Sequence, residues 1–154
     1  MLKVFVLSFL ITFLYTPFGY LLQKGNSLRS FSLQLIFGLI ILSFISLSIN
    51  FLSPVNELLS SLILIFSFFI VIKYQSIFLS KKYLIFCFIS SLIIFLLIAI
   101  SDVYRPDAGL YHLPYIGILN NEKIIFGLSN LHFRFGHISI IQYTSAISNN
   151  FIFR

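Results

Sequence analysis

Long apolar stretches separated by short polar segments fill the first two thirds of the chain. Each approaches the roughly 20 residues that an α-helix needs to cross about 30 Å of hydrocarbon. The third is the shortest uninterrupted run, and its helix is expected either to extend back through Pro54 and Val55 or to be tilted within a thinned bilayer. The pattern predicts an all-α fold, a polytopic bundle of transmembrane helices. The expected spans are residues 4–22, 31–52, 55–72 and 83–100.

A polar segment, residues 101–137, follows the fourth stretch. It contains three of the four carboxylates of the chain and all three histidines. After it, residues 138–153 are mostly apolar again, which predicts the start of a fifth span near residue 138. Since no internal repeat or low-complexity linker divides the sequence, residues 1–154 are expected to form a single membrane domain, the N-terminal part of a longer one.

The composition also indicates a membrane protein. Hydrophobic residues make up 59% of the chain and charged residues 9%, whereas soluble proteins contain about a quarter charged residues. The ten Lys and Arg are scattered between apolar stretches and form no basic stripe with interleaved aromatics, which excludes a nucleic-acid partner. Cys87 is the only cysteine, which excludes an internal disulfide and a cysteine-based metal site. The expected partner is the lipid bilayer, and the oligomeric state stays open.

The distribution of basic residues predicts the orientation of the chain, because cytoplasmic loops are enriched in Lys and Arg. The segment 101–137 contains three cations over a much greater length than the two short loops. This difference in density predicts that the segment 101–137 faces the non-cytoplasmic side. The two short loops between the predicted spans contain five cations: Lys24, Arg29, Lys73, Lys81 and Lys82.

The first stretch has a second interpretation, a secretory signal with Lys3 as its charged end. No small-residue cleavage site follows it, however. Pro17 and Gly19 are tolerated in membrane helices. A retained transmembrane helix is therefore the expected outcome.

A short helix along the membrane surface is predicted for residues 106 to about 119. The proline before Asp107 fits the first turn of a helix. Asp107, Leu110 and Tyr111 then share one face, because they are spaced by three and four residues. Residue type alone leaves Asp107 open between a reactive carboxylate and a solvated residue. Asp102, which directly follows the fourth stretch, is interpreted as a solvated helix-end residue.

One motif in this segment resembles a pattern of membrane-embedded glycosyltransferases of the GT-C type, including protein O-mannosyltransferase and lipid A aminoarabinose transferase relatives. The motif consists of Asp107, Tyr111, His112, Leu113 and Pro114. The stretch GLSNLHFRFG at residues 127–136 is similar to a block in uncharacterised bacterial membrane proteins grouped with these enzymes. The resemblance implies a glycosyltransferase of the bacterial inner membrane that uses a polyprenyl-phosphate-linked sugar on the non-cytoplasmic face.

The sequence departs from that family in two respects. The family implies more spans in a chain several times longer, so the active site is expected to need further residues. An acidic residue often follows the family's aspartate, whereas Ala108 follows Asp107 here. No cofactor is predicted: a divalent metal ion would be compatible with the resemblance, but no residue pattern supports one. His132 and His137 are five residues apart, and no HExxH motif occurs.

The resemblance implies that Asp107 acts as general base or helps to hold the reacting groups. Sugar transfer from a phosphate also needs cations that stabilise the leaving group. Arg134 is the best candidate by residue type, because guanidinium binds phosphate through two parallel hydrogen bonds, and Arg105 is the second. Both also fit interfacial residues whose charge reaches toward water. The other candidate substrate-binding residues are Tyr111, His112, His132 and His137.

Two other functions remain open. The chain could be a non-catalytic membrane module or transport component of an envelope complex, or a truncated reading frame without activity of its own. Transport is disfavoured, because the four predicted spans contain no ionisable residue at mid-membrane, where an ion path usually has one.

Overall fold

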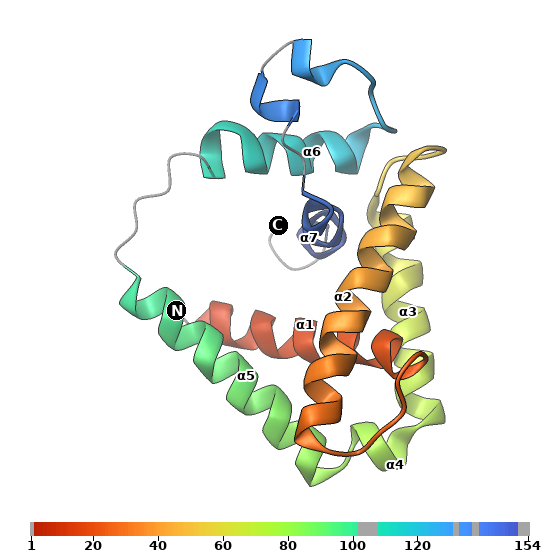
Figure 1. Cartoon of the computed structure of the whole chain (residues 1–154), viewed down its shortest axis with the longest axis vertical. Helices are drawn as coiled ribbons and strands as arrows, with labels where there is room; N and C mark the ends of the chain where they lie inside the picture. The colour runs from red at the N-terminus through yellow and green to blue at the C-terminus, as the bar shows by residue number, and fades with distance from the viewer. Residues whose placement is uncertain (1, 102–107, 131–132, 137–138, 151–154) are drawn as a thin grey trace. The chain divides into compact units, whose positions relative to one another are not determined.

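The computed structural model describes residues 2–101, 108–130, 133–136 and 139–150. All the regular elements in these residues are helical, which confirms the all-α fold (Figure 1). The α-helices are α1 (Leu2–Tyr20), α2 (Leu28–Asn50), α3 (Glu57–Lys73), α4 (Gln75–Phe78), α5 (Lys81–Ile100), α6 (Leu113–Asn121) and α7 (Ile141–Asn149). A π-helical turn spans Ala108–His112, and 3-10 turns span Leu128–Asn130 and Phe133–Gly136.

Three helices in the described part of the chain, α1, α2 and α5, are long and apolar enough to cross a membrane. Large apolar side chains such as Phe44 on α2 and Leu97 on α5 are exposed on their surfaces. In water such surfaces would be costly, whereas lipid solvates them. The chain is therefore a membrane protein.

The third apolar stretch forms α3, which is 17 residues long. Its start is fixed by Asn56, whose Oδ1 accepts a hydrogen bond from the Leu59 N–H at 3.1 Å and so caps the first turn. The expected extension through Pro54 and Val55 is consequently not helical.

The apolar residues after 138 form α7, which is nine residues long.

The chain forms two compact units. Unit 1 comprises residues 1–41 and 63–103, and unit 2 comprises residues 42–62 and 104–154. The residues of α2 and α3 are divided between them.

Aromatic side chains form much of the core of unit 1. α1 runs antiparallel to α5, since Phe5 packs on Phe88 with ring centroids 5.4 Å apart and Phe13 packs on Tyr83 at 5.7 Å. The Tyr83 hydroxyl donates to the Phe13 carbonyl at 2.9 Å, which satisfies the polar end of a fully buried ring. Phe31 from α2 packs edge-on against the same ring, with centroids 5.1 Å apart.

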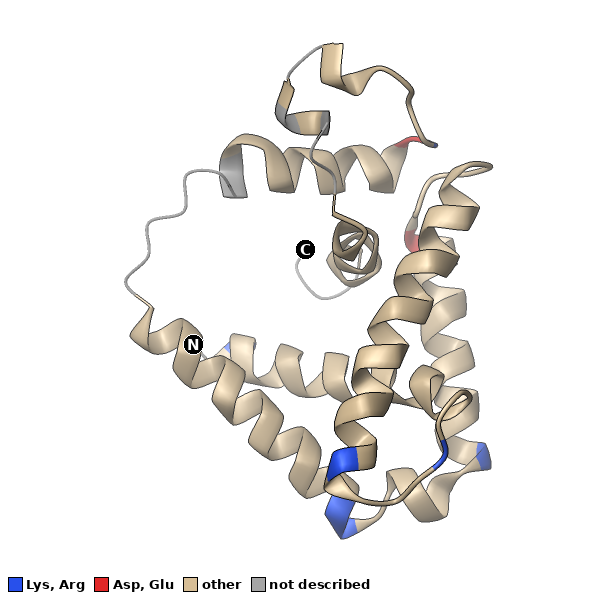
Figure 2. Ribbon diagram, viewed as in Figure 1, with Lys and Arg blue, Asp and Glu red and all other residues tan. Residues whose placement is uncertain are grey.

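The basic residues of the two short loops lie together at one end of unit 1 (Figure 2). α4 joins the end of α3 to the start of α5, so Lys73 lies at the same end of the unit as Lys81 and Lys82. Arg29 and Lys82 line one cavity, so the loop between α1 and α2 lies at the same end. The sequence pattern of basic loops is thus also a spatial cluster.

Two glycines allow α1 and α2 to approach closely. A Cβ added to Gly19 would lie 1.7 Å from the Gln34 carbonyl oxygen, and one added to Gly38 would lie 2.1 Å from the Tyr15 carbonyl oxygen. Small residues at such positions let helix backbones pack against each other, which is a main source of helix association in lipid.

Gly38→Ala should therefore destabilise the protein by about 1–3 kcal/mol through overpacking. Gly117→Ala is the matched control, because Gly117 is also helical and a Cβ there meets nothing within 4 Å. Alanine is favoured over glycine in a helix by about 1 kcal/mol, so the control should be neutral or stabilising. Thermal unfolding of both variants in detergent, followed by circular dichroism, measures the difference. Equal midpoints would contradict the close approach.

Candidate functional site

The predicted short helix in the polar segment belongs to unit 2 and is described from Ala108 to Asn121. Its first part is a π-helical turn that ends at His112, and α6 continues directly from Leu113. Pro114 lies in the first turn of α6, where no intrahelical bond needs its missing N–H. Two residues of the motif, Tyr111 and His112, thereby lie where the two helical segments meet.

His112 is held by a side chain from the first turn of α7. The amide oxygen of Gln142 accepts from the Ser139 N–H at 3.1 Å, which fixes the orientation of the amide. Gln142 Nε2 then lies 2.8 Å from His112 Nδ1. Because an amide nitrogen can only donate, Nδ1 is the acceptor, and in the neutral imidazole the proton is on Nε2. The His112 ring also packs against Tyr111, with ring centroids 4.2 Å apart.

A pair of buried tyrosines forms a second link between α6 and α7. Tyr115 and Tyr143 are each 3% exposed, and their hydroxyl oxygens are 3.5 Å apart. Burial and then the hydrogen bond with Tyr143 raise the pKa of the Tyr115 hydroxyl above its ordinary value. Tyr115 consequently stays neutral at physiological pH and can donate or accept a hydrogen bond.

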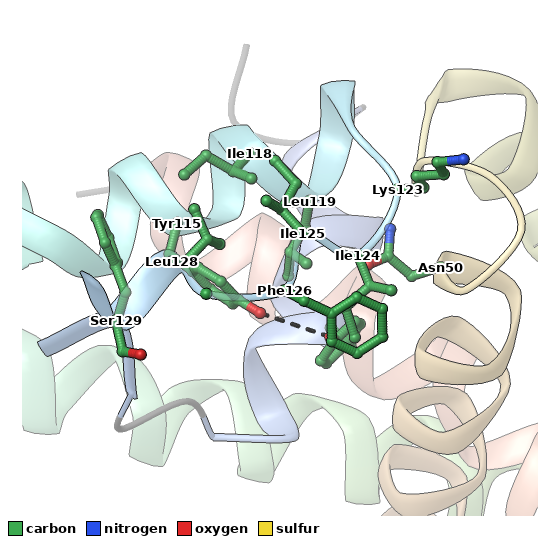
Figure 3. A pocket seen from close by; sticks show the side chains of 13 residues that line it. Asn50, Tyr115, Ile118, Leu119, Lys123, Ile124, Ile125, Phe126, Leu128 and Ser129 are labelled. Atoms are coloured by element: carbon green, nitrogen blue, oxygen red, sulfur yellow. Dashed lines mark hydrogen bonds between the residues drawn. The ribbon is translucent and has the colours of Figure 1, made fainter. Parts of the chain in front are cut away.

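A cavity of about 250 Å³ lies beside this tyrosine pair (Figure 3). Its walls are mostly apolar, and polar groups lie at a few positions, as is typical of small-molecule sites. Gly127 has a φ of +85°, a conformation that favours glycine, and it turns the chain at the wall of the cavity. The apolar lining residues are Ile118, Leu119, Ile124, Ile125, Phe126, Leu128 and Phe135, and the polar ones include Asn50, Tyr115, Lys123, Ser129 and Tyr143.

Asn50, at the end of α2, is fully buried and anchors one wall of this cavity. The Asn50 side-chain Nδ2 donates to the Glu122 carbonyl at 3.0 Å, and the Asn50 backbone carbonyl accepts from the Ile124 N–H at 2.9 Å. The amide oxygen has no hydrogen-bond partner among the described residues, and Figure 3 shows it directed toward Ile124. A buried unpaired acceptor costs about 1–3 kcal/mol.

A second cavity in unit 2, of about 350 Å³, has a polar lining. Asn150 contributes to its wall and donates from Nδ2 to the Val55 carbonyl at 2.7 Å and to Ser60 Oγ at 2.8 Å. The Val55 N–H in turn donates to the Leu119 carbonyl at 2.8 Å. These bonds join the ends of α6 and α7 to the connection between α2 and α3. The lining residues are Asn56, Glu57, Leu58, Asn120, Asn121 and Asn150.

Only some of the predicted site residues have described side chains. Tyr111 and His112 do, and they lie in contact with each other. Arg134 belongs to the 3-10 turn Phe133–Gly136, but its side chain is outside the described part. Four further candidates lie outside the described residues altogether: Arg105, Asp107, His132 and His137. Among the described residues no group of three His, Cys, Asp or Glu side chains could hold a metal ion.

The structure adds polar residues that the sequence interpretation passed over. Gln142 interrupts the apolar stretch 138–153, and Asn50 lies within the predicted span 31–52. A polar amide within an apolar run is the signal that could have identified both, because amides in such runs need partners when buried. The tyrosine pair had no signal, since Tyr115 and Tyr143 are 28 residues apart.

Apolar helices of membrane-spanning length and a helical unit with two cavities define a helical membrane protein with a candidate binding site. The chain belongs to the family described as a domain of unknown function (DUF8201), whose family model matches residues 1–154. No curated protein and no solved structure shows significant similarity to it.

Asn150→Ala should destabilise the protein by about 1–3 kcal/mol, because it removes the amide that pairs with a buried carbonyl. Asn121→Ala is the control: Asn121 is exposed, and its Nδ2 donates only within its own helix, to the Gly117 carbonyl at 2.8 Å. Its effect should stay within about 0.5 kcal/mol. Thermal unfolding in detergent would test both. A loss from Asn121→Ala as large as that from Asn150→Ala would contradict a specific role of Asn150.

Proposed function

We propose that this chain forms the N-terminal part of an integral membrane glycosyltransferase that uses a polyprenyl-phosphate-linked sugar on the non-cytoplasmic face of a bacterial inner membrane. The observation that supports this most is the environment of the motif that resembles GT-C enzymes. His112 has a fixed hydrogen-bonding orientation through Gln142. On the same helical segment, Tyr115 and Leu119 line a cavity with apolar walls, and Asn120 and Asn121 line a polar one.

The two cavities suit the two parts of such a donor. The apolar walls around Tyr115 fit isoprenoid units, and Lys123 at the same cavity is a cation for the phosphate. The asparagines and Glu57 of the polar cavity offer the amide and carboxylate groups that bind sugar hydroxyls. His112 Nε2–H can donate to a phosphate or hydroxyl oxygen.

The reaction is a substitution at the anomeric carbon of the donor. The acceptor hydroxyl oxygen forms a bond to that carbon, the bond from the carbon to the phosphate oxygen breaks, and polyprenyl phosphate leaves with the electron pair. Asp107 takes the proton of the acceptor. Arg134 and Lys123 stabilise the negative charge on the leaving phosphate. The donor sugar and the acceptor are open in this proposal.

Asp107→Asn should lower sugar transfer by about 10²- to 10⁴-fold, because it keeps the size of the side chain and removes the base. The full-length protein in membrane vesicles would be supplied with a panel of undecaprenyl-phosphate sugars, and the release of undecaprenyl phosphate measured. Asp102→Asn is the control and should be milder.

Equal transfer by Asp107→Asn and the parent, or a larger loss from Asp102→Asn, would remove Asp107 from this role. If the parent protein neither binds undecaprenyl phosphate nor turns over any donor, the alternative is favoured. That alternative is a non-catalytic membrane module or transport component of an envelope complex.

The proposed sidedness can be tested by cysteine labelling in a Cys87→Ser background. A cysteine at the exposed position Asn121 should react with an impermeant maleimide outside intact cells, whereas one at Asn26, in the basic loop, should react only after lysis. External labelling of Asn26→Cys with protection of Asn121→Cys would reverse the orientation.

A further inference from the structure

Two cations in unit 1 line the same cavity although they come from distant parts of the sequence. Arg29 lies in the first turn of α2, and Lys82 lies in the first turn of α5. The cavity has a volume of about 500 Å³ and is also lined by Asn26, Ser27, Leu28 and Ile85. The fold thus places a guanidinium and an ammonium group at one hollow of the surface.

These charges lack an acidic counterpart in the described part of their unit. The two described carboxylates, Glu57 and Glu122, both belong to unit 2. The other cations of the cluster lie at the same end of unit 1 (Figure 2), so like charges gather around the cavity. An anion that binds here would relieve the repulsion between like charges.

The local backbone favours an anion as well. α2 begins beside Ser27, whose Oγ accepts from the Ser30 N–H at 3.1 Å, and α5 begins beside Ser80, whose Oγ accepts from the Tyr83 N–H at 3.3 Å. Both helices therefore start at this end of the unit, with the positive ends of their dipoles near the two cations.

The remaining lining residues indicate what kind of anion fits. Leu28 and Ile85 are more than half exposed and lie next to the cations. α5 continues from Ile85 as an apolar helix that is long enough to cross a membrane. A ligand that matches both features has an anionic group attached to apolar chains, and the bilayer supplies such molecules at high local concentration.

We propose that this cavity binds an anionic phospholipid of the surrounding bilayer. The phosphodiester lies between Arg29 and Lys82, and the acyl chains extend along Ile85 and the outer surface of α5. Arginine suits this role, because its planar guanidinium forms two hydrogen bonds to phosphate oxygens. The site is independent of the proposed sugar transfer, because unit 1 contains none of the residues proposed to catalyse it.

The test is lipid retention by the full-length protein in nanodiscs of phosphatidylcholine with a minor fraction of phosphatidylglycerol, measured by native mass spectrometry. Arg29→Gln and Lys82→Gln should each weaken phosphatidylglycerol binding about fivefold, because each basic residue near an anionic lipid contributes about that factor to binding. The double variant should weaken binding roughly 25-fold. Lys81→Gln is the matched control. It removes the same charge from the neighbouring residue, which does not line the cavity, and should change binding less than twofold.

Any of four outcomes would overturn the proposal. A loss from Lys81→Gln equal to that from Lys82→Gln would show diffuse attraction to the basic end. Equal retention of phosphatidylcholine and phosphatidylglycerol, or full displacement by millimolar inorganic phosphate, would show that no anionic phospholipid is selected. Displacement by undecaprenyl phosphate at far lower concentration than phosphatidylglycerol would reassign the cavity to the polyprenyl lipid. Circular dichroism of the three variants verifies that each is folded.

Discussion

Buried side-chain amides form hydrogen bonds to backbone groups in the connections between helices, and the structure of these connections depends on those bonds. A buried peptide group that leaves a helix needs a new partner, because it has no contact with water. In unit 2, Asn150 binds the Val55 carbonyl, and Asn50 binds the Glu122 carbonyl. In unit 1, Gln34 does the same for the turn after α1, since its Nε2 donates to the carbonyls of Gln23 and Gly25. The same chemistry therefore recurs in both units.

The two units combine this device with different packing. Unit 1 uses aromatic rings around Tyr83 and the glycine contact between α1 and α2, so its interior is mainly apolar. Unit 2 buries a larger share of hydroxyl and amide groups, and Ser43 of α2 is hydrogen-bonded to Thr144 of α7. Polar interiors in membrane proteins are costly unless each group is paired, and they often mark sites that bind ligands. The candidate site lies in the unit with the more polar interior.

Much of the fold could be predicted from hydrophobic runs, because length and apolarity determine which segments cross a membrane. α2 and α5 were expected at residues 31–52 and 83–100 and are observed within three residues of those limits, as Leu28–Asn50 and Lys81–Ile100. A short helix was also expected after the fourth apolar stretch, from residue 106 to about 119, and the described part of the chain is helical from Ala108 to Asn121. The links between elements could not be predicted in this way. Gln142 meets His112 across 30 residues, and no local pattern encodes that distance. The role of Asp107 stays a prediction.

The fixed amide of Gln142 gives His112 a selective polarity. Turning the amide over would break its bond to the Ser139 N–H, so Nδ1 remains occupied as an acceptor and Nε2 presents its proton. Any molecule that meets Nε2 must then supply oxygen lone pairs, as phosphates, carboxylates and hydroxyls do. A metal ion binds only an Nε2 that carries no proton. In the neutral imidazole the proton would then be on Nδ1, where it would face the N–H groups of Gln142. A single glutamine thus makes this imidazole selective for oxygen acceptors over cations.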